Sequence, residues 1–346
     1  MATAALLDQP GLRAELTYPF GHPEPGAPVE LAPGVSLLRI PVPGPLRHVN
    51  CYLLTDGDGT AVVDTGMNTA EARAIWEGVE GLRVSRVIAT HFHPDHVGLA
   101  GWLCERHGAP LVMTRGEWLY ARMLAADARD EVPAEMTAWW RAAGWSEDQV
   151  EHARARGWAG FRRIVSPLAL GFMRIADGDR LAIGGADWRV VVGSGHSPEH
   201  ACLLDERRGI LVAGDQALPR ISPNVSLTVS EPDGDPLGEW FASIDKLRGL
   251  DPALLVLPGH GDPFRGLHGR LDRMEGEHRE RLDALEAHLA QPRRAVDCFA
   301  VLFRRPIGAD MLGMATGEAL AHLRRLEREG RARAEARDGV RWWGLA

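Results

Sequence analysis

Cysteine is scarce in this chain: 346 residues contain four, and no two of them form a CxxC pair. This spacing excludes a disulfide framework and a zinc knuckle, and it is typical of a reducing compartment. Lysine is scarcer still, because Lys246 is the single one, and 39 basic residues face 47 acidic ones for a net charge of −8. Such an acidic balance argues against a surface devoted to nucleic acid.

Long hydrophobic runs are also missing, since no apolar stretch approaches the roughly 20 residues that a membrane-spanning helix needs. The first 26 residues carry acids and prolines where a secretory leader has a basic end and a continuous apolar stretch. We therefore expect a cytoplasmic protein without membrane attachment, whose first twenty-odd residues form a loose arm. With 45% hydrophobic and 25% charged residues, the composition is that of a folded globular chain.

Histidine and aspartate follow four apolar segments that read as strands. The segments cover residues 86–90, 188–193, 210–213 and 254–257, and the polar residues that follow them are His91, His196, Asp215 and His260. Because a sheet gathers its strand ends along one rim, we expect these four side chains to lie close together.

The segment His91-Phe92-His93-Pro94-Asp95-His96 places three imidazoles and a carboxylate within six residues. A hydrophobic core cannot easily hold them, because each buried imidazole would need its own hydrogen-bond partner. A loop at the end of a strand can hold them, and there they could serve two neighbouring metal ions. After this loop the pattern predicts one helix, from Asp95 to His107, closed by Gly108.

These motifs resemble the metallo-β-lactamase superfamily over residues 35–265. HFHPDH at 91–96 is similar to its HxHxDH signature, and AVVDTG at 61–66, GSGHSPEH at 193–200, VAGD at 212–215 and LPGHG at 257–261 follow in the family's order. The resemblance implies an α/β fold, an αββα sandwich with metals at one edge. It implies that the first metal binds His91, His93 and His196, that the second binds Asp95, His96 and His260, and that Asp215 bridges both.

The implied ligand set contains five imidazoles and two carboxylates, a chemistry that favours two divalent ions, Zn²⁺ first and Fe or Mn as alternatives. Two ions about 3.5–4 Å apart can share a hydroxide that attacks the substrate. Asp95 and Asp215 are the expected catalytic carboxylates. Asp64 and His200 are expected to orient ligands by hydrogen bonding rather than to bind metal.

Differences between this sequence and better-known branches of the superfamily narrow the range of expected substrates. Asp215 stands where dedicated β-lactamases of this fold usually have Cys or Ser, which argues against an antibiotic hydrolase. Glyoxalase II usually has Lys nine residues after the bridging Asp, and this chain has Asn224 there. In place of a lactonase-type Tyr, the same loop offers Arg220, Ser222 and Asn224 as substrate-binding groups, and Arg220 could grip a carboxylate or phosphate.

Residues 115–172 hold five of the eleven tryptophans and read as a helical insertion. Met136, Trp139, Trp140 and Ala143 lie on one helical face. Two interpretations stay open: Trp139 and Trp140 either pack the insertion against its own sheet or wall an apolar pocket for an acyl or aryl group.

We divide the chain into a metallo-β-lactamase-fold catalytic domain, residues 1–277 including the insertion, and a C-terminal domain, residues 278–346. The latter reads as three helices and a β-hairpin around Asp338-Gly339, the shape of a small winged-helix unit. It holds 13 arginines against 10 acids, interspersed as on a solvated helix face. Docking or contact within a homodimer is favoured over nucleic-acid binding as its role.

The combined prediction is a dinuclear metal-dependent hydrolase of a small ester-like substrate, a thioester, lactone or carboxylic ester. One alternative is a metal-dependent phosphodiesterase or ribonuclease, which would bind substrate far less well as salt rises. A second is a mononuclear iron sulfur dioxygenase. A third is a regulator whose metal domain only senses a ligand.

Overall fold

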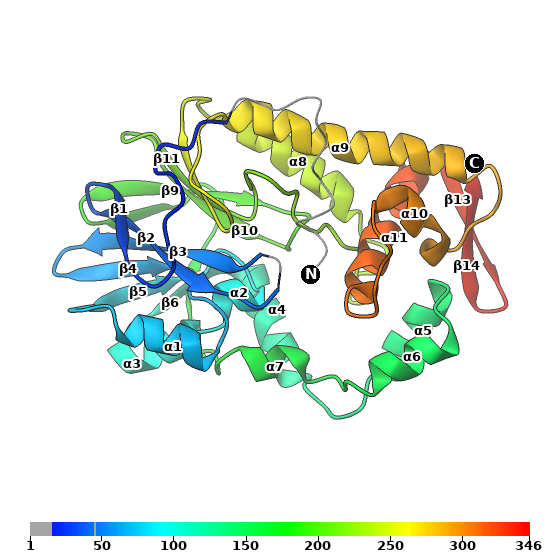
Figure 1. Ribbon diagram of the computed structural model, residues 1–346, viewed down its shortest axis with the longest axis horizontal. Helices are drawn as coiled ribbons and strands as arrows, with labels where there is room; N and C mark the ends of the chain where they lie inside the picture. The colour runs from blue at the N-terminus through cyan, green and yellow to red at the C-terminus, as the bar shows by residue number, and fades with distance from the viewer. Residues whose placement is uncertain (1–15, 45) are drawn as a thin grey trace.

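Two β-sheets packed face to face form the centre of the molecule, as a computed structural model that describes residues 16–44 and 46–346 shows (Figure 1). The expected loose arm therefore lies largely outside the described residues. The first sheet has the strand order β1 (Val29–Ala32), β2 (Val35–Pro41), β3 (His48–Asp56), β4 (Gly59–Val63), β5 (Val84–Ile88), β6 (Leu111–Thr114) and β7 (Met173–Ile175). The second has the order β12 (Leu255–Pro258), β11 (Ile210–Gly214), β10 (His200–Asp205), β9 (Ala186–Gly193) and β8 (Arg180–Ile183).

Side chains that point alternately to the two faces of a strand explain why each sheet packs on both sides. In β3, Cys51 and Leu53 face one core and Tyr52 and Leu54 face another, because successive residues of a strand point to opposite sides of the sheet. The core between the sheets includes Tyr52 from the first sheet and Trp188 from the second, which are both almost fully buried. Both faces of each sheet are thus covered, and this is the expected αββα sandwich.

Helices cover the outer face of each sheet (Figure 1). The first sheet packs against α1 (Ala70–Glu77) and α3 (Ala100–His107), whose buried side chains share its outer core. The second sheet packs against α8 (Pro236–Arg248) and α9 (Leu267–His288).

The helix expected from Asp95 to His107 is two helices, and this expectation was wrong. Chain segment α2 (Pro94–Val97) ends before Gly98, and α3 begins at Ala100. The break follows from close packing: a Cβ at Gly98 would lie 2.5 Å from the Gly66 carbonyl oxygen, and Leu99 donates its N–H to that same carbonyl rather than to a helical partner. Tertiary contacts with the 64–67 loop therefore override the helical pattern.

The insertion consists of α4 (Arg115–Ala126), α5 (Ala134–Ala142), α6 (Glu147–Arg154) and α7 (Gly160–Ile164). A capping box between Ser146 and Gln149 starts α6. The insertion spans two cores: Trp118 packs against the first sheet's outer core, whereas Trp140 and Trp145 join the core of α8, α9 and the C-terminal helices.

The C-terminal elements are η2 (Ala295–Cys298), α10 (Phe299–Leu302), α11 (Leu312–Arg328) and the hairpin β13 (Ala332–Arg337) and β14 (Val340–Leu345). Helix α9 runs without a break through residues 277 and 278, so the two parts of the chain share one helix. The winged-helix assignment stays a prediction. Within residues 16–44 and 46–346, no helix is both long and apolar enough to cross a membrane.

Two fully buried imidazoles join α9 to α11. The His322 Nδ1–H donates to the Glu318 carbonyl, 2.8 Å away, so that His322 Nε2 accepts from His278 Nδ1–H at 3.1 Å. Burial lowers the pKa of His322 to about 3 and that of His278 well below its ordinary value, with a further lowering from the Arg281 charge.

These lowered pKa values predict acid sensitivity. An unfolded histidine takes up a proton near pH 6.5 whereas the folded pair does not, so the stability that the pair provides is present above pH 6.5 and is lost as pH falls toward 3. His278→Gln keeps a donor for His322 without titrating. Denaturant unfolding at pH 7.5 and 5.5 measures the free energy of unfolding, which should fall less for this variant than for the wild type. The difference should be up to about 1.4 kcal/mol per pH unit. If the free energy of unfolding of the variant depends on pH as strongly as that of the wild type, the assignment is wrong.

Candidate metal centre

Loops at the ends of four strands bring the predicted ligands to one edge of the sandwich. In the second sheet, β11 and β12 are parallel, and β9 is antiparallel to β10, which is antiparallel to β11. The carboxyl ends of β9, β11 and β12 therefore share one edge, and the residues that follow them are His196, Asp215 and His260. The loop after β5 in the first sheet brings HFHPDH to the same place.

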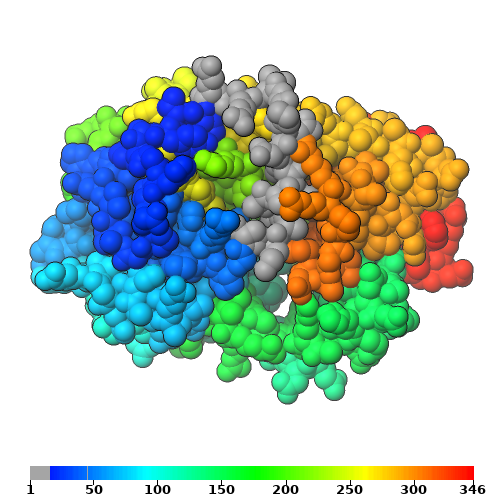
Figure 2. All heavy atoms as spheres, viewed as in Figure 1, coloured from blue at the N-terminus to red at the C-terminus, as the bar shows by residue number. Residues whose placement is uncertain are grey.

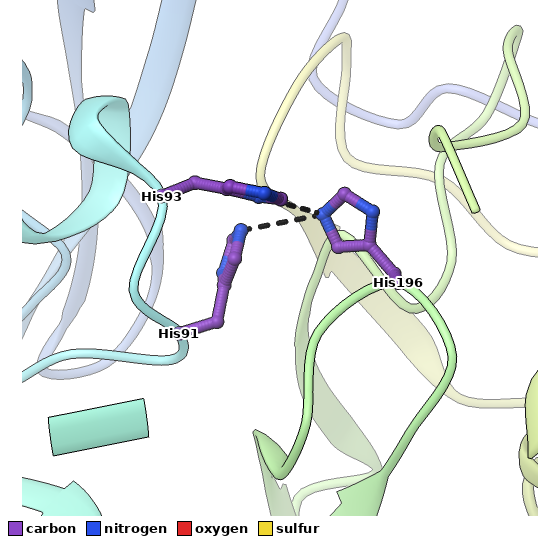
Figure 3. A group of neighbouring side chains, drawn as sticks. All are labelled: His91, His93 and His196. Atoms are coloured by element: carbon purple, nitrogen blue, oxygen red, sulfur yellow. Dashed lines mark hydrogen bonds between the residues drawn. The ribbon is translucent and has the colours of Figure 1, made fainter. Parts of the chain in front are cut away.

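The first group of ligands contains three imidazoles that point toward one another (Figure 3). His93 Nδ1 lies 3.1 Å and His91 Nε2 lies 3.3 Å from His196 Nε2. In Figure 3, His91 and His93 come from one loop and His196 from the facing loop.

The second group contains Asp95, His96 and His260. The Asp95 Oδ2 lies 3.2 Å from His260 Nε2 and 3.8 Å from His96 Nε2. Asp215 lies between the two groups, because its carboxylate is 3.5 Å from His96 Nε2, 3.5 Å from His196 Nε2 and 3.6 Å from His260 Nε2. The structure thus gathers all seven predicted ligands into three overlapping triads: His91, His93 and His196; His91, His96 and Asp215; Asp95, His96 and His260.

Hydrogen bonds on the outer side of the site orient most of these imidazoles. His196 Nδ1–H donates to the Asn224 carbonyl and His260 Nδ1–H to the His48 carbonyl, both at 2.7 Å. His96 Nδ1–H donates to the Asp64 carboxylate at 2.7 Å. With Nδ1 protonated and facing away, each Nε2 presents its lone pair to the centre, as a metal ligand must.

Asp64 takes the supporting position expected of it. Its carboxylate accepts from the Thr90 N–H and the Thr90 hydroxyl in addition to His96. Since the Thr90 hydroxyl hydrogen goes to Asp64, its oxygen accepts from His91 Nδ1–H at 2.9 Å. Asp64 is 2% exposed and has a φ of 60°, a left-handed conformation that is rare outside glycine and that its bonds to Thr90 and His96 hold in place.

His200 also lies behind the ligands. Its ring stacks on that of His91 with 4.7 Å between centroids, and its Nε2 accepts the Asp215 backbone N–H at 3.0 Å. Burial lowers the pKa of His200 well below its ordinary value. A neutral ring in this place supports both a ligand ring and the backbone of Asp215.

The nitrogen and oxygen atoms that face the centre are suited to bind cations. Among the described residues, the buried atoms His96 Nε2 and Asp215 Oδ1 have no hydrogen-bond partner, and they lie 3.5 Å apart. Burial alone would raise the pKa of Asp215, but the charges of His260 and His96 outweigh it and hold the pKa well below its ordinary value. Burial would likewise lower the pKa of His96, yet the Asp215 and Asp64 charges raise it. The carboxylates thus favour positive charge here, which a proton or a metal ion can supply.

A glycine allows the ligand loops to approach so closely. A Cβ at Gly259, the residue before His260, would lie 2.2 Å from Asp215 Oδ1 and 2.8 Å from His96 Cε1. Any other residue would have to displace a ligand.

Glu117 is a site residue that the sequence analysis missed. It lies in α4, is fully buried, and its carboxylate accepts from the Phe92 N–H at 2.8 Å and from the Ser197 hydroxyl and Glu199 N–H at 2.7 Å each. It therefore connects the loop of His91 and His93 to the loop of His196. Burial raises the pKa of Glu117 to about 7. A single Glu at the start of an insertion carries no sequence signal for this role.

The three polar residues predicted to bind substrate differ in their availability. Ser222 is 3% exposed and donates to Glu277 at 3.3 Å, and Asn224 donates its side-chain N–H to Glu318 at 2.9 Å. Arg220 has a 63% exposed side chain, lies over the Tyr18 ring and comes no closer than 3.7 Å to Asp262. Arg220 is therefore the most accessible of the three.

Trp139 and Trp140 lie in the interface between the insertion and the C-terminal helices. Trp139 packs partly buried against that core, and Trp140 stacks on Trp145 with parallel rings 4.8 Å apart. Trp140 and Trp145 line a cavity of about 480 Å³ whose other wall is residues 307–314. Figure 2 shows these segments, green and orange, lying against each other.

Fold and site together define the class of protein: the chain belongs to the metallo-beta-lactamase superfamily, whose family model matches residues 44–260. Residues 282–346 match the model of the metallo-beta-lactamase-like C-terminal domain. Family membership and the gathered ligands identify a metal-dependent hydrolase.

Similarity to known proteins supports this assignment. A crystal structure of a beta-lactamase domain protein from Burkholderia ambifaria is 36% identical, with a TM-score of 0.88, and the match covers 97% of this chain and 99% of that one. The probable metallo-hydrolase YqjP of Bacillus subtilis is 25% identical over 85% of this chain and 92% of its own. An atrochrysone carboxyl ACP thioesterase of Aspergillus fumigatus is 24% identical over 66% of this chain and 41% of its own.

Replacing Glu117 tests its connecting role. Glu117→Ala leaves buried donors without an acceptor, at about 1–3 kcal/mol for each, and should also weaken retention of metal because both ligand loops loosen. Glu105→Ala, an exposed change on α3, is the matched control. Denaturant unfolding and metal retention against a chelator measure both effects. Equal free energy of unfolding and equal metal retention in the Glu117 and Glu105 variants would show that Glu117 does not hold the two ligand loops together.

Proposed function

We propose that the chain hydrolyses a small ester-like substrate, a thioester, lactone or carboxylic ester, at a pair of divalent metal ions. The observation that carries the proposal is the overlap of the three triads through His91, His96 and Asp215. Residues His91, His93 and His196 would hold one ion, Asp95, His96 and His260 the other, and Asp215 both. The predominance of imidazole favours Zn²⁺, with Fe and Mn as alternatives.

When bound, such ions supply Lewis acidity and bring the pKa of water toward neutrality. The chain's own groups supply position and proton transfer. Asp95 has a 13% exposed side chain against 8% for Asp215, so it is the carboxylate better placed to accept the proton that an attacking water releases. Arg220 is the accessible cation beside the site and suits an acidic group on the substrate.

Two arginines of the C-terminal segment are already paired with acids, which favours an ester over a phosphodiester. Arg325 is paired with Asp235 and Glu329, each at 2.8 Å, and Arg331 with Asp283 and Glu286, each at 2.6 Å. Guanidinium groups that are already paired offer little to a phosphate backbone. The thioesterase among the relatives adds support for an ester-like substrate.

A substrate panel tests the proposal. Metal content by elemental analysis should approach two ions per chain, and thioesters, lactones or carboxylic esters should be hydrolysed with loss of activity in chelator. β-Lactams and phosphodiesters are included as competing classes. Turnover confined to phosphodiesters, with binding that weakens steeply as salt rises, would replace the ester proposal with the nuclease alternative.

Asp215 is the residue whose loss should be most damaging. Asp215→Ala removes the carboxylate that touches three ligand imidazoles, so turnover should be abolished and the bound metal per chain should fall. Asp187→Ala is the control, because Asp187 lies near the start of β9, at the opposite end of that strand from His196. Full turnover in Asp215→Ala would contradict the assignment.

A further inference from the structure

The loop that follows Asp215 connects a candidate metal ligand to the C-terminal part of the chain. Within it, the Asn224 carbonyl accepts His196 Nδ1–H at 2.7 Å. This bond determines which nitrogen of His196 faces the centre, because a protonated Nδ1 leaves Nε2 to face His91, His93 and Asp215. The orientation of the His196 ring thus depends on the position of the Asn224 carbonyl.

Helix α11 holds that carbonyl in place. The Asn224 side-chain N–H donates to Glu318 Oε2 at 2.9 Å, and the Leu227 N–H donates to the Gly317 carbonyl at 3.0 Å. A Cβ at Gly317 would lie 2.6 Å from Ser226 Oγ, so glycine is what lets the loop lie directly on the helix. The loop is therefore attached to α11 on both sides of Ser226.

Glu318 is a carboxyl group buried among apolar side chains, a position that destabilises the fold unless the group has partners. It is 6% exposed on a helix whose neighbouring buried residues include Ala315, Ala319 and Leu320. Its cation partner is Arg281 of α9, at 3.6 Å, and burial raises the pKa of Glu318. A carboxyl group in such surroundings destabilises the fold unless its partners compensate, and here the Arg281 charge and the hydrogen bond from Asn224 do so.

From these contacts we infer that Glu318 is a positioning residue for the candidate metal centre. Acting through Asn224, the C-terminal segment holds the His196 imidazole, and the site is incomplete without α11. His196 lies within the range matched by the superfamily model and Glu318 within the range matched by the separate C-terminal domain, so one domain sets a ligand of the other. The inference rests on the proposed function only in taking His91, His93 and His196 as a metal site.

Metal affinity tests the inference without any substrate. Zn²⁺ affinity is measured by competition with a chromophoric chelator, and Co²⁺ titration reports the coordination of each ion from its visible spectrum. Glu318→Ala should lower the affinity for one of the two ions by about 10- to 100-fold and leave the affinity for the other unchanged. Glu318→Gln should restore most of the affinity, because an amide oxygen can still accept from Asn224.

Two further variants separate positioning from general stability. Glu327→Ala changes the same helix at a residue that pairs with Arg324, and metal affinity should stay at the wild-type value. Asn224→Ala should lower the affinity for the same ion as Glu318→Ala does. The double variant should lose little more affinity than either single variant, because both substitutions remove the same hydrogen bond. Glu318→Gln and Asn224→Ala keep the test valid if Glu318→Ala does not fold.

Wild-type affinity for both ions in Glu318→Ala and Asn224→Ala, or independent and additive effects of the two, would overturn the inference. A protein that binds both ions normally but hydrolyses no ester contradicts only the proposed substrate class. Unchanged metal affinity in the Glu318 variants contradicts only the role of α11.

Discussion

The constraint on which this structure depends is the gathering of seven candidate ligands, four of them buried, within one small volume. The carboxylates of Asp95 and Asp215 both lie beside His260, and they repel each other unless positive charge lies between them. The surrounding fold holds four of the candidate ligand imidazoles from behind. Asp64, Thr90 and two backbone carbonyls do so, by accepting from the ring N–H that faces away from the centre.

Contacts between distant parts of the chain make this arrangement rigid. Glu117 joins the ligand loop of the first sheet to that of the second. Tyr52, in the first sheet, donates its hydroxyl to the Pro258 carbonyl at 2.7 Å and so holds the loop of His260. Helix α11 adds a third connection through Asn224. Each connection crosses a boundary between layers or segments, which explains why a hydrolytic centre on one edge involves most of the molecule.

Local patterns were accurate where local physics decides the structure. The strands predicted over residues 188–193, 210–213 and 254–257 form as β9, β11 and β12, because a run of apolar residues is set by neighbours in sequence. The single helix from Asp95 to His107 was wrong because Gly98 packs against the Gly66 carbonyl, a contact that no local pattern reveals. Ser222 and Asn224, expected to face substrate, instead bond to Glu277 and Glu318. Their roles as substrate-binding residues stay predictions.

The amino-acid sequence by itself determined the family, because its motifs resemble those of the superfamily in residue type, spacing and order, and that resemblance implied the sandwich fold and the seven candidate ligands. Asp64 and His200 were expected behind those ligands, but only the tertiary structure placed Glu117 and Glu318 in contact with the ligand loops. Glu117 and Glu318 lie 25 and 122 residues from Phe92 and His196, the residues of the ligand loops that depend on them. A hydrogen bond of this kind is specified by where two loops meet in space, and a sequence pattern records only what lies close along the chain.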